Sequence, residues 1–508
     1  MTALVSLAKA VGARVRGYIG PRNVLHTVPA RARDYPKSIP RVPGAPIFGS
    51  LLELRRDRVA LQLRVPSEQG ELAVFGLGAF AGVMVTSPEI VHEIMVEKAD
   101  AFVKSAGLGV FARPLLGSGL LTSEHDFHKR QRRMMAPMFV HKRIVGFSDE
   151  MVRRAVSTQA RWKDGETIDA AAAMMRMTLE IVGKTLFDAE VGSEAAEINT
   201  ALEEAMEFVM KAVTSLVPIP PAVPTKRNAR NREVIARLDE TVYRMIRERR
   251  AATAAGAPDR GDFLSLLLAA RDEEATSNER EGKADGMTDV QVRDESMTLF
   301  LAGHETTANA MAWTLYLLAK NPDVRARLEA EIDDVLGDRQ VTAEDLARLP
   351  YALQVVKESM RLYPPAYVTS RMAERDVTIA GHAFPRGSLM IINIMGMHRS
   401  ARWFPAPDRF DPDRFAPARE KEIARHAYMP FGAGPRICIG SHFALLEAHL
   451  ALITLTQHVR LELVSDEPVA YEPLITLRPR GGIPMRVLRR RATWASATPS
   501  VRPPPMPE

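Results

Sequence analysis

The residue whose type and setting most directly suggest chemistry is the single cysteine of this 508-residue chain, Cys438. It lies within FGAGPRICIG, residues 431–440, together with three glycines and Arg436. The strongly helical segment after Gly440 predicts that Cys438 lies at or just before a helix N-terminus, where the helix macrodipole favours the thiolate. The glycines allow backbone N–H groups and a large flat partner to approach the sulfur. A buried, inert cysteine needs no such loop, so the segment indicates a ligand site.

A second polar group interrupts an apolar helical segment. A capping-box spacing at residues 288–291 and the following periodicity predict one helix over residues 289–320, long enough to cross a domain at about 1.5 Å per residue. Its middle contains a polar run of Gly303, His304, Glu305, Thr306 and Thr307. Glycine weakens a helix interior and threonine hydroxyls bond back to carbonyls one turn earlier. We therefore expect the centre of this helix to be locally opened and polar, and to face another group.

A third group combines one acid with two arginines. Glu358 and Arg361 in KESMRLYPP lie three residues apart, on one face of a helix that the two prolines end. Arg414 lies between two phenylalanines in RFDPDRF, and an arginine buried by apolar neighbours needs an acidic partner.

Composition and charge restrict the function. The chain is 46% apolar and 26% charged, as in ordinary globular proteins. One cysteine excludes an internal disulfide and a multi-cysteine metal cluster. The net charge of +6 belongs to the ends: residues 1–33 carry +6, residues 485–508 carry +4, and the body carries 57 − 61 = −4. Nucleic-acid binding by the body is therefore not expected.

The chain also shows its organisation. No segment has the roughly 18 uninterrupted apolar residues of a membrane-spanning helix. Residues 1–34 form a cationic segment that we expect to be flexible or to associate with an anionic membrane surface, and residues 489–508 a disordered tail. Residues 71–89 favour a β-hairpin, and most of the remainder has helical spacing. We expect a mainly α protein with a smaller β-sheet region (α+β), cytoplasmic and at most peripherally bound to a membrane.

These groups together resemble a known family. The cysteine loop is similar at every defining position to the haem-ligand loop of the cytochrome P-450 haem-thiolate monooxygenases; the matching residues are Phe431, Gly432, Gly434, Arg436, Cys438 and Gly440. AGHETT, residues 302–307, resembles the oxygen-binding segment of that family's central helix, and Glu358 with Arg361 and Arg414 resembles its structural network. The resemblance implies the cytochrome P-450 fold over residues 35–488 as a single catalytic domain, with a long central helix over haem and the cysteine loop beneath.

The resemblance also implies a role for each matching residue. Cys438 would be the axial thiolate of the iron of haem b, whose electron donation favours O–O cleavage. Glu305 and Thr306 would form the acid–alcohol pair that delivers protons, and Ala302 and Gly303 would shape the oxygen pocket. The residues implied to hold the haem are Phe431 of the loop and four propionate contacts, His128, Arg132, Arg371 and Arg436. Many relatives have tryptophan at the position of His128, where a protonated imidazole could bind a propionate.

The implied reaction inserts one oxygen atom of O2 into a hydrophobic small molecule such as a terpenoid, fatty acid or steroid-like compound. Electrons would come from NAD(P)H through a separate ferredoxin and ferredoxin reductase or a flavoprotein, because no reductase motif follows Cys438. A basic cluster is expected to bind an acidic redox partner; its members are Lys129, Arg130, Arg132, Arg133, Lys142 and Arg143. Candidate substrate contacts are residues 105–121, residues 206–223, Phe300, Ala302, Val368 and Thr369. We expect a monomer.

Two other classes remain open from the sequence. One is a haem-thiolate enzyme that uses peroxide or rearranges its substrate, although relatives of that kind often lack the acid–alcohol pair. The other is a non-enzymatic haem sensor or binding protein, or a haem-free cysteine nucleophile, for which His442 is the one local candidate base.

Overall fold

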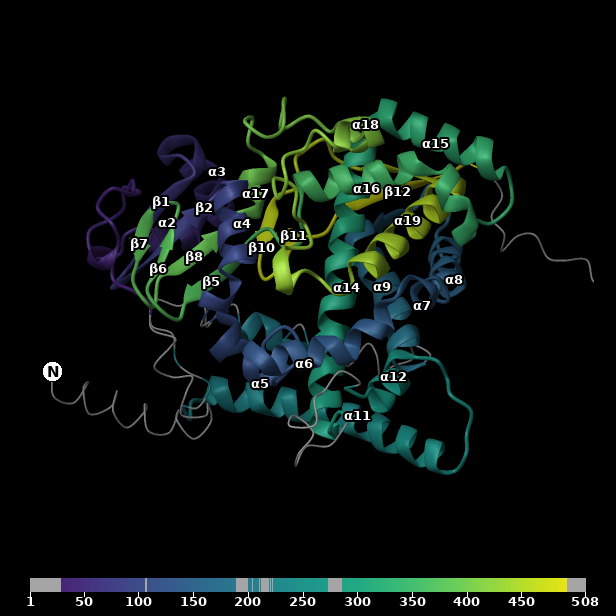
Figure 1. The fold of residues 1–508 in the computed structure, drawn as a ribbon. Coiled ribbons are helices and arrows are strands. Elements are labelled where there is room, and N and C mark those ends of the chain that lie inside the picture. The colour runs from purple at the N-terminus through teal and green to yellow at the C-terminus, as the bar shows by residue number, and fades with distance from the viewer. Residues whose placement is uncertain are drawn as a thin grey trace, which may run out of the picture.

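The computed structural model describes residues 29–490, apart from positions 106, 189–199, 203, 210, 212–218, 220, 222 and 273–285. Most of the predicted N-terminal segment, most of the C-terminal tail and part of the candidate substrate segment 206–223 lie outside the described residues. Figure 1 shows helices gathered around one long central helix, with the larger sheet to one side.

The central helix is α14 (Asp289–Lys320). It begins and ends where the sequence predicts, because the Thr288 hydroxyl accepts from the backbone of Gln291 while the Gln291 side chain accepts from the backbone of Thr288. Helix α9 (Ala170–Phe187) packs along α14, and α11, α16 and α19 contact it on other sides. The longer helices around α14 are α3 (Arg58–Gln69), α6 (His125–Met135), α8 (Ser148–Ala160), α11 (Lys226–Ala254), α15 (Pro322–Leu336), α16 (Pro350–Leu362) and α19 (Ser441–His458).

Short helices and single turns connect these elements. The short α-helices are α2 (Leu51–Arg56), α4 (Pro88–His92), α5 (Arg113–Leu116), α7 (His141–Val145), α12 (Phe263–Ala269), α17 (Ile394–His398) and α18 (Pro417–Glu420). The turns that bear on the site are η2 (Glu93–Glu97), η7 (Pro412–Phe415) and η8 (Gly434–Arg436).

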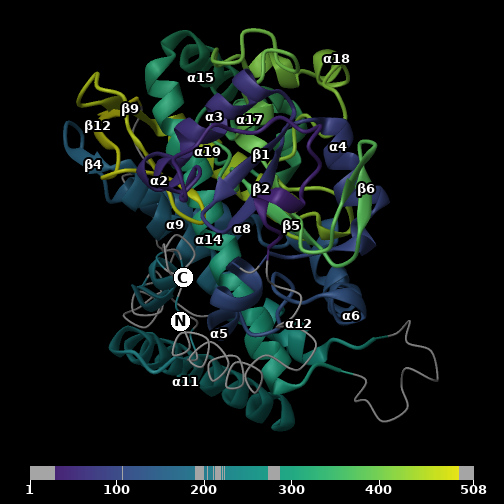
Figure 2. The same cartoon turned by 90° about the vertical axis from the view of Figure 1, so that its left-hand side faces the viewer.

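The larger sheet has the strand order β1-β2-β8-β5-β3 and faces the viewer in Figure 2. The hairpin predicted for residues 71–89 is confirmed, since β1 (Leu72–Leu77) pairs antiparallel with β2 (Phe80–Val85). The other strands of this sheet are β3 (Phe102–Val103), β5 (Thr369–Ala373) and β8 (Leu389–Ile392). The smaller sheets contain β4 (Thr167–Asp169), β6 (Val377–Ile379), β7 (His382–Phe384), β9 (Val459–Leu463), β10 (Tyr471–Pro473), β11 (Leu477–Pro479) and β12 (Pro484–Arg489).

The hydrophobic core is divided between the helices and the larger sheet. One large hydrophobic cluster joins the helices around α14, and a smaller cluster lies against the larger sheet. The expected mainly α architecture with a smaller β region is thus confirmed.

Candidate active site

One face of α14 is open in the middle of the molecule. From Val292 to Leu318, all of which are described, the residues that are not buried are Leu299, Ala302, Gly303 and Thr306. Their spacing places them on one helix face. Ala302 is exposed although it lies at the centre of a helix packed on its other sides. A hollow therefore opens on α14 at the AGHETT segment.

The helix stays regular through this segment, so the predicted local opening is not observed. The Thr306 and Thr307 hydroxyls donate to the carbonyls of Ala302 and Gly303, at 2.7 and 3.2 Å, as expected for helix threonines. A Cβ on Gly303 would lie 3.1 Å from a methyl carbon of Val182 on α9. The glycine therefore allows the close approach of α9 to α14.

Glu305 is buried and anchored to a distant part of the chain. Its Oε1 accepts from the Thr476 hydroxyl and, at 2.8 Å, from Nε of Arg478. Asn309, one turn further along α14, donates to the same Thr476 hydroxyl at 3.1 Å. Sequence reasoning missed Thr476 and Arg478. A buried carboxylate requires partners, but nothing in the sequence indicated that the β10–β11 segment provides them.

The cysteine loop is a tight turn held by its own backbone. The Cys438 N–H donates to the Phe431 carbonyl at 2.9 Å, and helix α19 begins three residues later at Ser441, as predicted. Phe431 is half-buried against the main core. Gly434 has a φ of 66°, and a Cβ there would lie 1.9 Å from the Met95 carbonyl oxygen, so this position requires glycine.

The thiol of Cys438 retains accessible surface. The surrounding protein nevertheless raises its pKa above the usual value, because burial outweighs the Gly440 backbone N–H and the charge of Arg132. The start of α19 therefore acts in the predicted direction, toward the thiolate, but its effect on the pKa is smaller than that of burial. A cation bound at the sulfur would reverse the balance.

Five basic side chains gather near this loop, and we call them the cationic cluster: Lys104, His128, Arg132, Arg371 and Arg436. Arg436 donates to the Ser123 carbonyl at 2.7 Å and pairs with Glu124. Arg132 donates to the Ile437 carbonyl at 2.8 Å, next to the cysteine. Arg371 extends from β5 and donates to the Ser370 carbonyl at 2.8 Å. The structure thus brings together the four predicted propionate contacts and adds Lys104.

Burial lowers the pKa of every member of the cationic cluster, and repulsion by other members lowers it further for all except Arg132. The pKa falls to about 10 for Arg371, about 7 for Lys104 and about 3 for His128. A bound anion would oppose these shifts, so the protonated imidazole predicted at His128 depends on the ligand of the cluster. Glu124 is the acid that acts on Lys104, Arg371 and Arg436, and it offsets only part of their repulsion. The cluster suits an anionic ligand.

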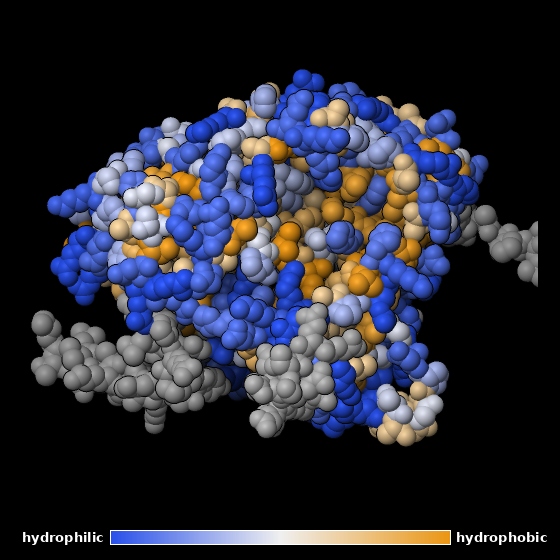
Figure 3. Space-filling view, in the orientation of Figure 1, coloured by the Kyte–Doolittle hydropathy of each residue, from blue (hydrophilic) through white to orange (hydrophobic). Residues whose placement is uncertain are grey.

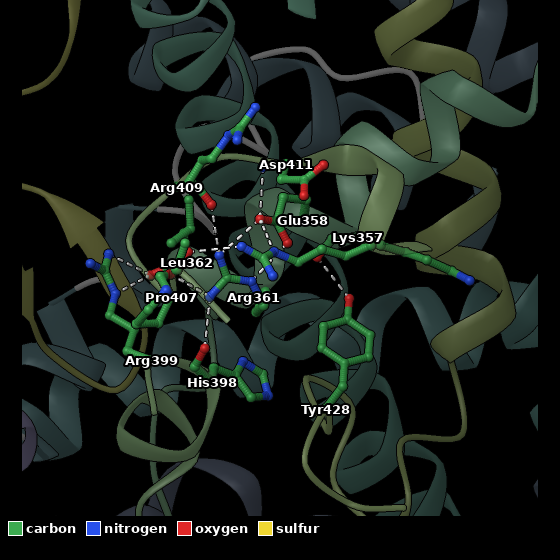
Figure 4. A network of polar contacts seen from close by, with 12 residues as sticks. Lys357, Glu358, Arg361, Leu362, His398, Arg399, Pro407, Arg409, Asp411 and Tyr428 are labelled. Atoms are coloured by element: carbon green, nitrogen blue, oxygen red, sulfur yellow. Dashed lines mark hydrogen bonds and ion pairs between the residues drawn. The ribbon is translucent and has the colours of Figure 1, made fainter. Parts of the chain in front are cut away.

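The acid–arginine group forms the buried network of Figure 4. Both Glu358 and Arg361 have no exposed surface, and Arg361 donates to the two Glu358 oxygens at 2.7 and 2.8 Å. Arg414 of η7 donates to Glu358 at 3.3 Å, so the predicted need of a buried Arg414 for an acidic partner is confirmed. Arg361 also donates to the carbonyls of the segment after α17, which fixes that segment to α16.

Only part of the predicted basic docking cluster is well exposed to solvent. Arg130 and Arg133 pair with the buried carboxylate of Asp272 and are only partly exposed. Lys142 and Arg143 are exposed. Lys129 is exposed as well, with an ion pair of 3.2 Å to Asp126. Three exposed apolar side chains come from the same segments and from the cysteine loop: Phe127, Val140 and Ile437.

The donor set fits haem. One thiol is present, and among the described residues no group of three or more His, Cys, Asp or Glu is arranged to bind a metal ion. A metal bound at Cys438 therefore has to bring other ligands with it, as a porphyrin does. The cationic cluster matches the carboxylates of such a macrocycle, and Figure 3 shows apolar side chains on the hollowed middle of one face, around α14 and α19.

Comparison with known proteins agrees with this site. The cytochrome P450 family model matches residues 40–484. Cyclooctatin synthase of Streptomyces melanosporofaciens is 34% identical over 435 residues, 85% of this chain and 92% of that protein. Cyclooctat-9-en-7-ol 5-monooxygenase of the same organism is 34% identical over 425 residues, 82% of this chain and 88% of that protein. Pentalenene oxygenase of Streptomyces avermitilis is 32% identical over 442 residues, 86% of this chain and 94% of that protein.

The chain therefore belongs to the cytochrome P450 family and is an enzyme of the P450 monooxygenase class, with the haem-thiolate centre that the family implies. None of the helices in the described part of the chain is both long and apolar enough to cross a membrane.

Proposed function

We propose that this enzyme hydroxylates a cyclic terpenoid, using haem b, O2 and electrons from a separate redox partner, within a catalytic unit of residues 35–488. The observation that carries the proposal is the open face of α14, which exposes Ala302 and Thr306 in the interior of a protein that also presents an accessible cysteine and a cationic cluster. The named relatives that oxidise terpenoid substrates support the substrate class.

Different residues of the site would bind different parts of the cofactor. Cys438 would bind the haem iron, and the guanidinium groups of Arg132, Arg371 and Arg436 would bind its propionates, with Lys104 as a further cation. His128, which is buried among these cations, would donate to a propionate through a ring N–H. Haem bound there supplies O2 activation, which a thiolate ligand promotes.

Proton delivery would fall to Thr306 and Glu305. The Thr306 hydroxyl lies on the open face and donates to the Ala302 carbonyl, so a small rotation would direct its proton into the hollow. Glu305 lies beside it in sequence but is buried and held by Arg478. Glu305 would therefore supply protons through rearrangement of this ion pair and not from a position in the hollow.

The described side chains near the open face suit an apolar substrate. Partly buried apolar residues are available on the central helix and on the two segments predicted to contribute, and one follows β10: Leu299, Val110, Leu120, Leu121, Val368 and Ile475. Apolar side chains at these positions favour a hydrocarbon skeleton or a simple alcohol. An exposed face with Lys142, Arg143 and Ile437 would receive an acidic ferredoxin or flavoprotein.

Two measurements test this proposal. The reduced, carbon monoxide-treated protein should show the haem-thiolate spectrum, and Cys438→Ser should lose it. Cyclic terpenes should shift the spin state of the ferric protein more than fatty acids or steroids of similar size. A terpene panel without effect would contradict the substrate class, and an unchanged spectrum in Cys438→Ser would contradict the site.

A variant distinguishes the monooxygenase from a peroxide-using enzyme. Thr306→Ala should divert reducing equivalents from product to hydrogen peroxide, while Thr307→Ala, whose hydroxyl is buried, should leave the product yield per NAD(P)H nearly unchanged. Unchanged coupling in Thr306→Ala, together with efficient turnover by added peroxide, would favour the alternative.

A further inference from the structure

A second carboxyl group of α14, at Glu295, has no place in the proposed chemistry. It lies ten residues before Glu305, about 15 Å along the helix at 1.5 Å per residue. Glu295 has no exposed surface. Its two oxygens accept from the Leu120 backbone N–H at 3.0 Å and from Nε2 of Gln131 at 2.9 Å. A fully buried carboxyl with two neutral donors and no cation is unusual enough to require an explanation.

The nearby arginines of the surrounding elements have partners other than Glu295. Arg293 of α14 lies between Asp239 of α11 and Asp294 of α14. From α6, Arg130 and Arg133 pair with Asp272, and from α5, Arg113 donates to the Ser118 hydroxyl. Burial raises the pKa of Glu295 to about 8, although the Leu120 N–H lowers it, and Asp294 is the one charged neighbour that adds to the rise.

The hydrogen-bonding pattern independently indicates a proton on this group. Gln131 is also fully buried, and its Oε1 accepts no hydrogen bond from the described residues. A carboxylic acid at Glu295 supplies the missing donor, since its O–H can donate to Gln131 Oε1 while its other oxygen accepts from Gln131 Nε2. A carboxylate would leave the amide oxygen unsatisfied, at a cost of about 1–3 kcal/mol.

This pair connects α14 to the elements that carry the cationic cluster. Gln131 lies on α6 one turn after His128 and directly before Arg132. Leu120 belongs to residues 117–124, and the far end of that segment binds Arg436 through Ser123 and Glu124. The same segment is also held by Asp294, which accepts from the Ser118 N–H at 2.7 Å. The position of α6 and of residues 117–124 therefore depends on contacts to this part of α14.

We propose that Glu295 carries a proton at neutral pH and that its acid form is a positioning residue, which holds α6 and residues 117–124 against α14 and thereby sets the geometry of the cationic cluster around its anionic ligand. The proposal rests on the proposed haem site for the identity of that ligand. Loss of the proton to solvent at alkaline pH would place a buried carboxylate beside Asp294 and weaken the pair with Gln131. The contacts that hold α6 and residues 117–124 against α14 would then loosen.

The test measures haem transfer from the holoenzyme to excess apomyoglobin between about pH 7 and about pH 9, a range centred on the expected titration. Wild type should release haem about tenfold faster at the upper end, a change worth about 1.4 kcal/mol. Glu295→Gln should give a rate that does not change with pH, because its amide does not titrate; it can pair with Gln131 through one N–H and its carbonyl oxygen and loses only the acceptor for the Leu120 N–H. Glu295→Leu should be fast at every pH. The matched control is Glu331→Gln on α15, a half-buried carboxyl that also accepts two hydrogen bonds, from the N–H groups of Tyr351 and Ala352.

The control should keep the wild-type profile. An equal alkaline rise in Glu295→Gln, or a flat wild-type profile, would overturn the proposal. Hydrogen exchange of residues 117–135, corrected for intrinsic rates, provides a second readout that does not depend on haem. Wild type should lose protection at alkaline pH and Glu295→Gln should not. A protein that binds no haem but shows this difference would contradict the proposed function and leave the positioning role intact.

Discussion

Replacing Arg361 with lysine tests the buried network around Glu358 most directly, because the substitution keeps the positive charge and removes the planar guanidinium group. Arg361 makes five hydrogen bonds: Nε and Nη2 to the Glu358 carboxylate at 2.7 and 2.8 Å, Nη1 to two carbonyls at 2.7 Å each, and Nη2 to a third at 3.1 Å. A lysine ammonium has three donors on one atom, so at least two of the acceptors lose their partner. At about 1.5–3 kcal/mol for each hydrogen bond to a charged group, the loss is about 3–6 kcal/mol. That loss approaches the whole stability of an ordinary domain, about 5–15 kcal/mol.

Urea unfolding followed by tryptophan fluorescence measures this loss. Trp313 is a suitable reporter, because it is fully buried and stacks on Tyr363 at a centroid distance of 4.1 Å, directly beyond the end of the helix that carries Arg361. The control is Arg375→Lys, which alters an ion pair with Asp100 whose side chains are 57% and 76% exposed and should cost less than about 1 kcal/mol. Equal shifts of the unfolding midpoint in the two variants would refute the reasoning.

Three further predictions concern other parts of the chain. Gly434→Ala should abolish haem incorporation, seen as loss of the Soret band, because its Cβ would lie 1.9 Å from a carbonyl oxygen of η2, whereas Gly432→Ala bears the strain of a similar positive φ without a clash and should retain more pigment. Gly303→Ala should destabilise the protein to urea because its Cβ would lie 3.1 Å from Val182, and Val182→Ala in the same chain should recover part of the loss; simple additivity of the two changes would contradict the packing role. His449 is buried with its pKa lowered to about 4, so it is uncharged in the fold. Its contribution to stability is present above about pH 6.5 and is lost as the pH falls, because the unfolded chain takes up the proton first. Between about pH 7 and about pH 5 the unfolding free energy should fall by about 2 kcal/mol less in His449→Gln than in wild type, and an identical fall would contradict the assignment.

Local features of the sequence determined much of this protein. The helix over 289–320 was predictable to the residue because its capping box and its terminal Pro322 act within one turn. The hairpin and the shared helix face of Glu358 and Arg361 follow from periodicities of two and about 3.6 residues, which depend on neighbours in the chain. The cysteine loop was recognisable for the same reason, since its glycines and Cys438 lie within ten residues.

Tertiary structure decided everything that depends on burial or on distant partners. Arg478 reaches Glu305 across 173 positions, and Asp272 pairs with two arginines that the sequence assigned to an exposed docking surface. The pKa shifts of Cys438 and His128 also depend on the tertiary structure: desolvation outweighs the local helix terminus at Cys438, and at His128 it adds to the repulsion by cations from distant segments. Spacing along the chain specifies which residues lie on one face, but the free energy of a charge depends on which parts of the chain surround it.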